Sequence, residues 1–266
     1  MHITSRDNSL LRLARLVRDG KTDETIFVEG LRLAEEALRS GLQVEAVIYS
    51  EEIAQKERAA STIEQLSKVA AKSASVSEKL LETISYTKTP QGIVLLARRP
   101  TNSRKTLTNS VDSESLLVVL HQINNPVNVG AILRTAEAAG VSGVVTTKNT
   151  SDPFSPKSLR GAMGSAFRLP VWSEANYDEV IKWCTEKNVQ TICTSVSAEK
   201  AYTELDWTTA VALILGPEST GLTPAETAAA AQTVSIPMHG SVESLNVSVA
   251  AGIVLFEAAR QRSQKS

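Results

Sequence analysis

The chain has 266 residues, of which 42% are hydrophobic and 21% charged, and this composition is ordinary for a soluble globular protein. Its length exceeds that of a usual single domain and predicts two domains. No apolar run approaches the ~20 residues that cross a bilayer, which excludes a membrane-spanning protein. The formal net charge of −1 gives no support to a nucleic-acid partner, because domains that bind nucleic acid often carry a basic excess. Any basic surface must therefore be local.

The N-terminus and the cysteines indicate in which cellular compartment the protein is located. Residues Met1 to Asp7 lack the basic-then-apolar pattern of a secretion signal. The two cysteines, Cys184 and Cys193, lie in helix and strand patterns, which favours structural roles over that of a nucleophile. We therefore expect a cytoplasmic protein. The three histidines have no ligand spacing with each other or with these cysteines, so no metal site is expected.

The first hundred residues alternate between helix and strand patterns. Apolar residues at helical spacing between Asn8 and Gly20 predict an opening amphipathic helix. The elements expected after it are a strand at 25–28, a helix at 31–38, a strand at 44–49, mainly helix over 52–83 with a short strand near Val69, and a buried strand at 92–97. Together they predict a first α/β domain over residues 1–98. Arg6 before the opening helix and Arg12, Arg15 and Arg18 within it form either a basic surface or a solvated helix face.

Residues 99–115 are rich in Ser, Thr and Asn and poor in apolar side chains, which predicts a linker. Beyond them, apolar runs alternate with helical patterns through a second domain, residues 116–266. Its strands are expected at 116–120, 143–146, 189–193 and 211–215, and its helices at 129–139, 177–186, 224–231 and 244–262. Apolar runs without polar alternation are typical of strands covered on both faces, so we expect a parallel sheet.

Three segments of the second domain place polar residues directly after an apolar strand, where open α/β sheets bind ligands. In the first, Asn128 is positioned to cap a helix whose amides suit an anion. Arg134 lies about one and a half turns further along that helix. Spacing alone favours a surface ion pair between Arg134 and Glu137 over a ligand contact.

The second and third segments, when each is taken alone, also allow both a ligand-binding and a purely structural interpretation. In Gly216–Leu222, glycines flank Glu218 and allow a ligand to approach the backbone closely, but a plain turn fits as well. In the third, Ser244 is a natural cap for the last helix, so Asn246 would lie near its positive end. The chain has neither a nucleoside triphosphate loop nor a dinucleotide-binding glycine turn, so energy-coupled and hydride chemistry are not expected.

Together and in this order, the segments resemble the SpoU/TrmH family of RNA 2′-O-methyltransferases. The motifs of that family have the forms Asn-x-Gly-x-x-x-Arg, Gly-x-Glu-x-x-Gly-Leu and Ile-Pro-Met…Ser-Leu-Asn-Val-Ser, and here they fall on Asn128–Arg134, Gly216–Leu222 and Ile236–Ser248. Residues 5–98 resemble the substrate-binding domain of the ribosomal-RNA members, which has an RNA-binding ribosomal-protein fold. The resemblance implies an α/β methyltransferase domain with a trefoil-knotted parallel sheet, S-adenosylmethionine as cofactor and a homodimer.

The resemblance also implies the reaction, which is methyl transfer to a ribose 2′-hydroxyl of structured RNA, with large-subunit ribosomal RNA favoured. The catalytic candidates are Arg134, Asn128, Glu218 and Asn246. The cofactor candidates are Thr194, from its position at a strand end, and Leu215, Gly216, Ile236, Met238, Ser244 and Leu245. The RNA-binding candidates are Arg134, Arg160, Arg12 and Arg15. A guanidinium is a poor base, so for Arg134 we favour a positioning role.

Three alternatives stay open from the sequence. A transfer-RNA 2′-O-methyltransferase would carry the same three motifs. A non-catalytic RNA-binding protein on this fold would be favoured if the arginine or the third-motif asparagine were missing, but Arg134 and Asn246 are present. An unrelated small-molecule transferase would have no use for a first domain that resembles a ribosomal protein.

Overall fold

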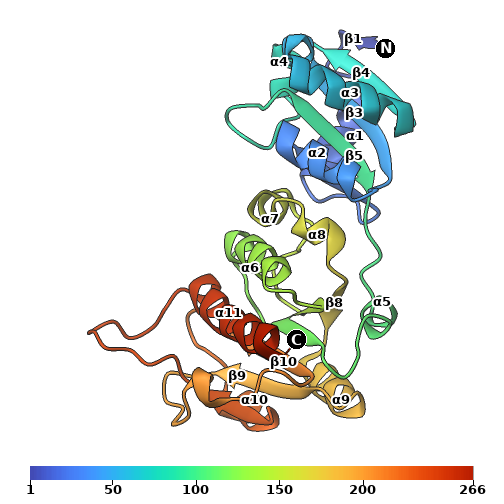
Figure 1. The fold of residues 1–266 in the computed structure, drawn as a ribbon. Coiled ribbons are helices and arrows are strands. Elements are labelled where there is room, and N and C mark those ends of the chain that lie inside the picture. Colours follow the sequence, from blue (N-terminus) through green and yellow to red (C-terminus); the bar gives the residue numbers. More distant parts are fainter. Residues whose placement is uncertain (266) are drawn as a thin grey trace. The chain divides into compact units, whose positions relative to one another are not determined.

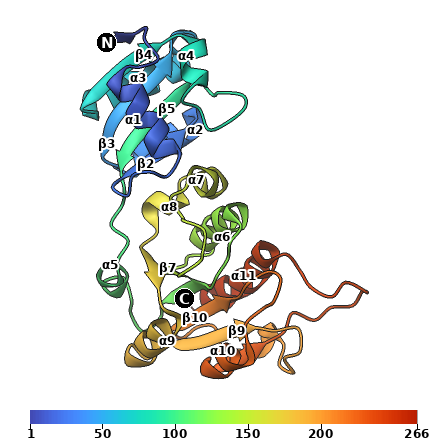
Figure 2. The same ribbon diagram turned by 180° about the vertical axis from the view of Figure 1, so that it is seen from behind.

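The computed structural model describes residues 1–265, and the chain forms two compact units (Figures 1 and 2). The first unit comprises residues 1–100 and 153–168, and the second comprises residues 101–152 and the chain from Leu169 onward. Within the described part of the chain, no helix combines the length and the apolar character needed to cross a membrane.

The first unit is built on a mixed five-stranded sheet in the order β1-β4-β3-β5-β2. Strand β5 runs antiparallel to β2 and β3, and the other pairs are parallel. The strands are β1 (His2–Ile3), β2 (Thr25–Glu29), β3 (Val44–Ser50), β4 (Lys72–Val76) and β5 (Ile93–Arg98). The helices are α1 (Ser9–Arg18), α2 (Leu31–Arg39), the 3-10 turn η1 (Ile53–Gln55), α3 (Glu57–Val69), α4 (Glu78–Glu82), α7 (Pro156–Ala162) and α8 (Ser165–Arg168). The short strand expected near Val69 lies at β4, because α3 continues to Val69.

The helices of this unit cover both faces of its sheet. Helices α1 and α4 bury Leu11 and Leu81 against one face, together with Phe27 of β2. Helices α2 and α3 pack on each other and on β2, β3 and β5. Asn8 caps α1, because its side chain accepts a hydrogen bond from the Leu10 amide at 2.9 Å.

Residues 153–168 belong by their contacts to the first unit, whereas the predicted boundaries placed them within 116–266. Helix α7 packs on β2. In the following turn Gly164, with φ +94°, lies so close to Glu36 that an added Cβ would be 2.7 Å from that side chain. Arg168 Nη1 lies 2.7 Å from Glu36 Oε2. These contacts join residues distant in sequence, so the local pattern held no sign of them.

The second unit contains a six-stranded parallel sheet in the order β11-β9-β10-β6-β7-β8, as expected for apolar runs covered on both faces. Its strands are β6 (Leu116–Leu120), β7 (Gly143–Thr147), β8 (Val171–Ala175), β9 (Gln190–Thr194), β10 (Val211–Leu215) and β11 (Gln232–Val234). Its helices are α5 (Arg104–Thr108), α6 (Pro126–Ala138), α9 (Tyr177–Glu186), the 3-10 turn η2 (Tyr202–Glu204), α10 (Pro224–Ala229) and α11 (Val247–Lys265). The edge strand β8 was not predicted, since Ser173 and Glu174 interrupt its apolar run.

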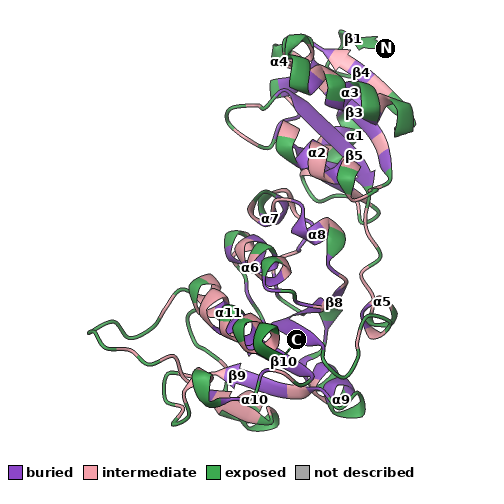
Figure 3. Cartoon of the chain, viewed as in Figure 1, coloured by how far each residue is buried: buried purple, intermediate pink, exposed green. Residues whose placement is uncertain are grey.

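Helices α6 and α11 pack together on this sheet (Figures 1 and 2). Residues of α9 form part of a core cluster with β6, β7, β9 and β10, in which Trp183 stacks edge-to-face on Trp172 at 5.6 Å. Leu107 of α5 is fully buried in the same cluster. The segment 99–115, expected as a linker, therefore contains a short helix anchored by one leucine. The burial colours of Figure 3 show that the strands form the interior of each unit.

Candidate active site

Helix α6 begins three residues earlier than its apolar pattern indicated. Asn125 Oδ1 accepts a hydrogen bond from the Val127 amide at 3.0 Å, and Pro126 occupies the first helical position. Asn125 is therefore the cap, and the expectation that Asn128 caps this helix was wrong. Asn128 instead lies in the first turn with only 5% of its surface exposed, which frees its amide for contacts outside the helix.

Asn128 connects the three motif segments. Its Nδ2 donates to Glu218 Oε1 at 2.6 Å, and its Oδ1 accepts from Asn246 Nδ2 at 3.3 Å. The segments can meet because β6 and β10 are parallel neighbours with Leu120 opposite Leu215, so the chain leaves both strands at the same edge of the sheet. Three of the four catalytic candidates thus form one hydrogen-bonded chain.

Asn246 also begins the last helix. Its Oδ1 accepts from the Ser248 amide at 2.9 Å and from the Ser248 hydroxyl at 2.6 Å, directly before α11. Ser244, which was expected to be this cap, is exposed and lies three positions before the first residue of the helix. Asn246 can take the role expected of Ser244, because an Asn side chain caps a helix as well as a Ser side chain does. With its oxygen engaged in the cap, Asn246 directs its amide nitrogen to Asn128.

Arg134 is exposed on α6. Considering all residues from 1 to 265, its guanidinium makes no hydrogen bond or ion pair, so the surface pair with Glu137 that spacing favoured is not formed. A guanidinium has five donors arranged to bind a carboxylate or phosphate in bidentate fashion. Arg134 therefore keeps its full capacity for an anionic ligand.

Most of the cofactor candidates lie at or beyond the carboxyl ends of β9, β10 and β11. Thr194 pairs in register with Val234, and Leu215 ends the adjacent strand β10. The loop that follows is tight, because a Cβ on Gly216 would lie 2.9 Å from Leu222 Cγ. The candidates between β11 and α11 are the half-buried Ile236, Met238 and Leu245 and the exposed Ser244. This edge offers backbone groups and apolar side chains together, a combination typical of small-molecule binding sites.

The RNA-binding candidates of the first unit differ in whether their guanidinium groups are exposed and free to bind RNA. Arg12 and Arg160 are exposed, on α1 and α7 respectively. Arg15 is half-buried, and its Nη2 donates to the Arg6 carbonyl at 2.9 Å. Arg18 donates to the carbonyls of Thr83 and Ser85. The arginine-rich helix therefore holds the fold together with Arg15 and Arg18 and leaves Arg12 free at the surface.

Both cysteines have the structural environment expected for them. Cys184 and Cys193 are fully buried in the core of the second unit. Burial raises the pKa of the Cys184 thiol to about 12 and also raises the pKa of Cys193. Since the thiolate is the nucleophilic form, neither side chain is suited to covalent catalysis near neutral pH.

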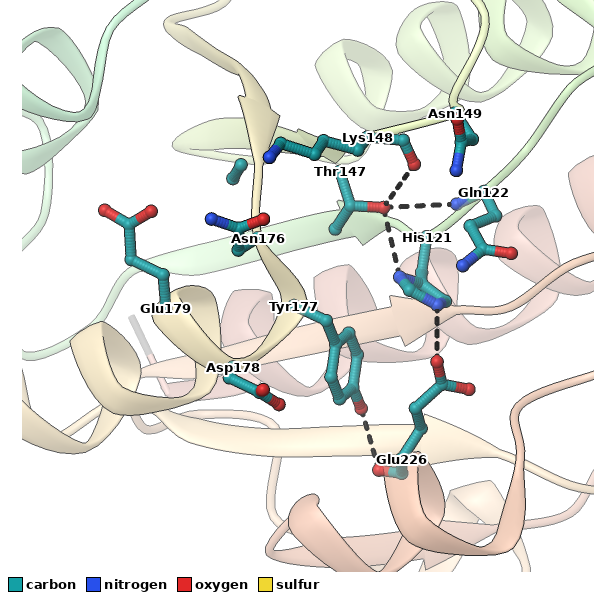
Figure 4. Close-up of a pocket in the computed structure, with 11 residues that line it drawn as sticks. His121, Gln122, Thr147, Lys148, Asn149, Asn176, Tyr177, Asp178, Glu179 and Glu226 are labelled. Carbon is teal, nitrogen blue, oxygen red and sulfur yellow. Dashed lines mark hydrogen bonds and ion pairs between the residues drawn. The ribbon is translucent and has the colours of Figure 1, made fainter.

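Sequence analysis missed a buried histidine. His121 follows β6, is 3% exposed, and lines an open pocket of about 520 Å³ at the carboxyl ends of β6, β7 and β8 (Figure 4). Its Nε2 lies 3.0 Å from Glu226 Oε1, and its Nδ1 lies 3.0 Å from Thr147 Oγ1. The sequence contains no sign of this environment, because the partners of His121 are a hydroxyl and a carboxylate distant in sequence.

Comparison with known families decides the class of this protein. A sequence profile of the SpoU rRNA methylase family matches residues 115–256, and a profile of the MRM3-like substrate binding domain matches residues 12–95. The chain belongs to the SpoU rRNA methylase family. The family suspected from the three motifs and from residues 5–98 is thereby confirmed.

Individual relatives agree with this assignment. The chain is 34% identical over 219 residues to the 23S rRNA (guanosine-2′-O-)-methyltransferase RlmB of Coxiella burnetii, covering 81% of this chain and 87% of that protein. The AdoMet-bound rRNA methyltransferase of Sinorhizobium meliloti has 30% identity and a TM-score of 0.84, covering 98% of this chain and 97% of that one. The AdoMet complex of the SpoU methyltransferase AviRb from Streptomyces viridochromogenes has 26% identity and a TM-score of 0.85, covering 96% and 98%.

These likenesses confirm two further expectations. The fold is that of SpoU methyltransferases, with a parallel sheet in the second unit. The enzyme class is also confirmed, so this family member is an S-adenosylmethionine-dependent RNA 2′-O-methyltransferase.

Proposed function

We propose that this enzyme methylates a ribose 2′-hydroxyl of large-subunit ribosomal RNA, and that the reaction takes place at the chain Glu218–Asn128–Asn246, with Arg134 of the same helix α6 holding the RNA. The observation that carries the proposal is the pair of hydrogen bonds of Asn128, 2.6 Å to Glu218 and 3.3 Å from Asn246, which joins all three motif segments. The names of relatives such as RlmB support ribosomal RNA as the substrate.

The residues present suit S-adenosylmethionine. The tight loop at Gly216 and the half-buried Ile236, Met238 and Leu245 offer backbone polar groups and an apolar surface for its adenosine and methionine parts. Thr194 and Leu215 end the neighbouring strands, and Ser244 is an exposed member of the same segment. When bound, the cofactor supplies an electrophilic methyl group on a sulfonium, so the protein has mainly to place the hydroxyl and remove its proton.

Arg134 holds the RNA in this proposal. Its exposed guanidinium, free of protein partners among residues 1–265, would bind the phosphate beside the target ribose in bidentate fashion. That phosphate, or a water, would accept the hydroxyl proton as the oxygen–methyl bond forms and the methyl–sulfur bond breaks, because a guanidinium stays protonated and is a poor base. Positioning of this kind can supply ~7–11 kcal/mol of the barrier.

Asn128, Glu218 and Asn246 would fix the ribose by hydrogen bonds. Asn128 is almost fully buried and both ends of its amide are engaged, so its orientation is set. Asn246 is held by the cap of α11. Glu218 accepts from Asn128 with one carboxylate oxygen, and the other is available for a ribose hydroxyl.

The remaining expectations extend this proposal. Residues 1–98 would select the RNA, with Arg12 as an exposed cation, and residues 116–266 would transfer the methyl group. Arg160 of α7 would be a further exposed cation that holds RNA. The second unit would be threaded through a trefoil knot, and the enzyme would act as a cytoplasmic homodimer without a metal. A dimer is supported by exposed Val249 and Phe256, which lie seven residues apart on one face of α11.

One experiment tests the proposal. Ribosomal RNA and transfer RNA, each lacking modification, are incubated with the enzyme and with cofactor carrying a labelled methyl group. Label on ribosomal RNA at a nucleotide whose 3′ phosphodiester becomes resistant to alkali is expected, because alkaline cleavage needs a free 2′-hydroxyl. Label on a base, or on transfer RNA alone, would contradict the proposal.

A further inference from the structure

His121 contacts the residue before the loop Gly216–Leu222 directly and is linked through Glu226 to the residue after it. Its backbone amide donates to the carbonyl of Leu215, the residue before the loop, at 2.9 Å. Its imidazole Nε2 lies 3.0 Å from Glu226 Oε1, and Glu226 Oε2 accepts from the amide of Thr223, the residue after the loop, at 2.8 Å. One residue therefore fixes where the loop leaves β10 and where it enters α10.

The imidazole is itself held on three sides, as Figure 4 shows. Thr147 Oγ1 lies 3.0 Å from Nδ1. The ring of Tyr177 packs edge-on at 4.6 Å, and the Tyr177 hydroxyl donates to the Glu226 carbonyl at 2.8 Å. Because an ionised carboxylate only accepts hydrogen bonds, Nε2 must carry the proton shared with Glu226.

Glu226 is suited to remain ionised in this arrangement. Partial burial acts to raise its pKa, but hydrogen bonds with Thr223 and the contact with His121 outweigh burial and hold the pKa below its ordinary value. The same side chain completes the capping box of α10 with Thr223. The His121–Glu226 contact thus joins the sheet to the first turn of α10.

The loop between these two anchors carries Glu218, which accepts the 2.6 Å hydrogen bond from Asn128. Its backbone is compact, with the Gly221 amide donating to the Pro217 carbonyl at 2.9 Å. In a compact loop with both ends anchored, a shift at Thr223 displaces Glu218 and Gly216 as well. The geometry of the reaction site therefore depends on a residue that lines a different pocket.

We propose that His121 is a positioning residue for methyl transfer, which acts through Glu226 to hold the Gly216–Leu222 loop in its cofactor-binding and Asn128-binding position. The inference rests on the proposed roles of Gly216 and Glu218. His121 does not touch the substrate in this account. Its contribution is the placement of the loop, so its loss should change both cofactor affinity and turnover.

The test compares His121→Leu with His121→Gln in the full-length enzyme. Leucine has a similar volume but no donor, whereas the glutamine amide can donate to Glu226. We expect His121→Leu to raise KM for S-adenosylmethionine about tenfold or more, the size expected for loss of one hydrogen bond to a charged group. Turnover should fall as well, and His121→Gln should recover part of both losses.

Val180→Ala is the matched control, because Val180 is fully buried on α9 in the same unit and its apolar side chain takes no part in the hydrogen bonds that anchor the loop. It should lower the melting temperature while KM for the cofactor stays near the wild-type value. If His121→Leu behaves like Val180→Ala, with reduced stability and unchanged KM and kcat, His121 is only structural and the proposal is overturned.

Glu226→Gln provides a second route if His121→Leu fails to fold. It keeps the size of the side chain but removes the charge that holds both Thr223 and His121, so it should also raise the cofactor KM. Unchanged kinetics for this variant would overturn the proposal. Calorimetric titration of the wild-type enzyme with S-adenosylmethionine distinguishes failure of this proposal from failure of the proposed function. Absence of binding there would refute the proposed function itself.

Discussion

Asn128 donates a hydrogen bond of 2.6 Å to Glu218, which lies ninety positions further along the chain. The bond joins the first turn of α6 to the loop after β10, and Asn246 extends it to the start of α11. Because each of these segments follows a strand of one parallel sheet, the sheet itself brings the three motifs of the family together.

Replacement of Asn128 should affect turnover more than folding. Asn128→Asp keeps the size but places a second carboxylate against Glu218, so the loop should move away and methyl transfer should fall by about a hundredfold, as a misplacement of ~1 Å can cause. Asn128→Ala should lose a similar factor with ~1–3 kcal/mol of stability. Single-turnover rates and thermal melts check both. Unchanged turnover in Asn128→Asp would show that this contact has no part in the reaction.

Arg134→Ala should leave the fold and cofactor affinity almost unchanged, because the guanidinium has no partner among residues 1–265. Methyl transfer should fall by about a hundredfold or more if the arginine orients the ribose and its phosphate. Arg134→Lys retains the charge but not the planar fork, so it should stay strongly impaired. The rates are measured at low and at saturating RNA, with the exposed Lys187→Ala as control. Full rescue by lysine would favour simple charge attraction.

Leu245→Glu should weaken S-adenosylmethionine binding, since it places a charge on a half-buried position of the segment between β11 and α11. Gly216→Glu should do the same, because even its Cβ would meet Leu222 at 2.9 Å. Val242→Glu in the same segment is the control, as Val242 is 62% exposed. Calorimetry decides the outcome. Equal affinity in Leu245→Glu and Val242→Glu would remove Leu245 from the cofactor site.

Arg12→Glu should weaken RNA binding without any change in cofactor affinity. If Arg12 contacts one phosphate, the slope of log affinity against log salt should decrease by about 1. Lys56→Glu, another exposed cation of the first unit, is the control. Filter binding over a range of salt concentrations provides the slopes. Identical slopes for Arg12→Glu and the wild type would leave Arg160 as the next candidate.

Both thiols should resist alkylation in the native enzyme at pH 8. The raised pKa of Cys184, about 12, and of Cys193 leaves little thiolate at that pH. Iodoacetamide labelling followed by mass spectrometry should show modification only after denaturation, and methyl transfer should survive the treatment. Rapid labelling of the folded protein with loss of activity would contradict the structural role of these residues.

Local patterns in the sequence were sufficient for most elements and for the family. Continuous apolar runs such as 116–120 and 211–215 predicted buried parallel strands, because a strand covered on both faces has no polar alternation. Asn128, Glu218 and Asn246 could be named in advance, since their spacing within three ordered motifs matched the family. The same local reasoning failed for β8 and α5, which have little or interrupted apolar character.

Tertiary structure alone decided which side chains meet. Asn128 meets Glu218, which lies 90 positions away, and Asn246, which lies 118 positions away. The partners of His121 lie 26 and 105 positions away, and the periodicity of a sequence cannot predict contacts between residues so far apart. The sequence by itself determined most of the elements, the family and the candidate residues, because these follow from spacing along the chain. The hydrogen bonds that orient them depend on the parallel sheet, which brings the ends of distant strands to one edge.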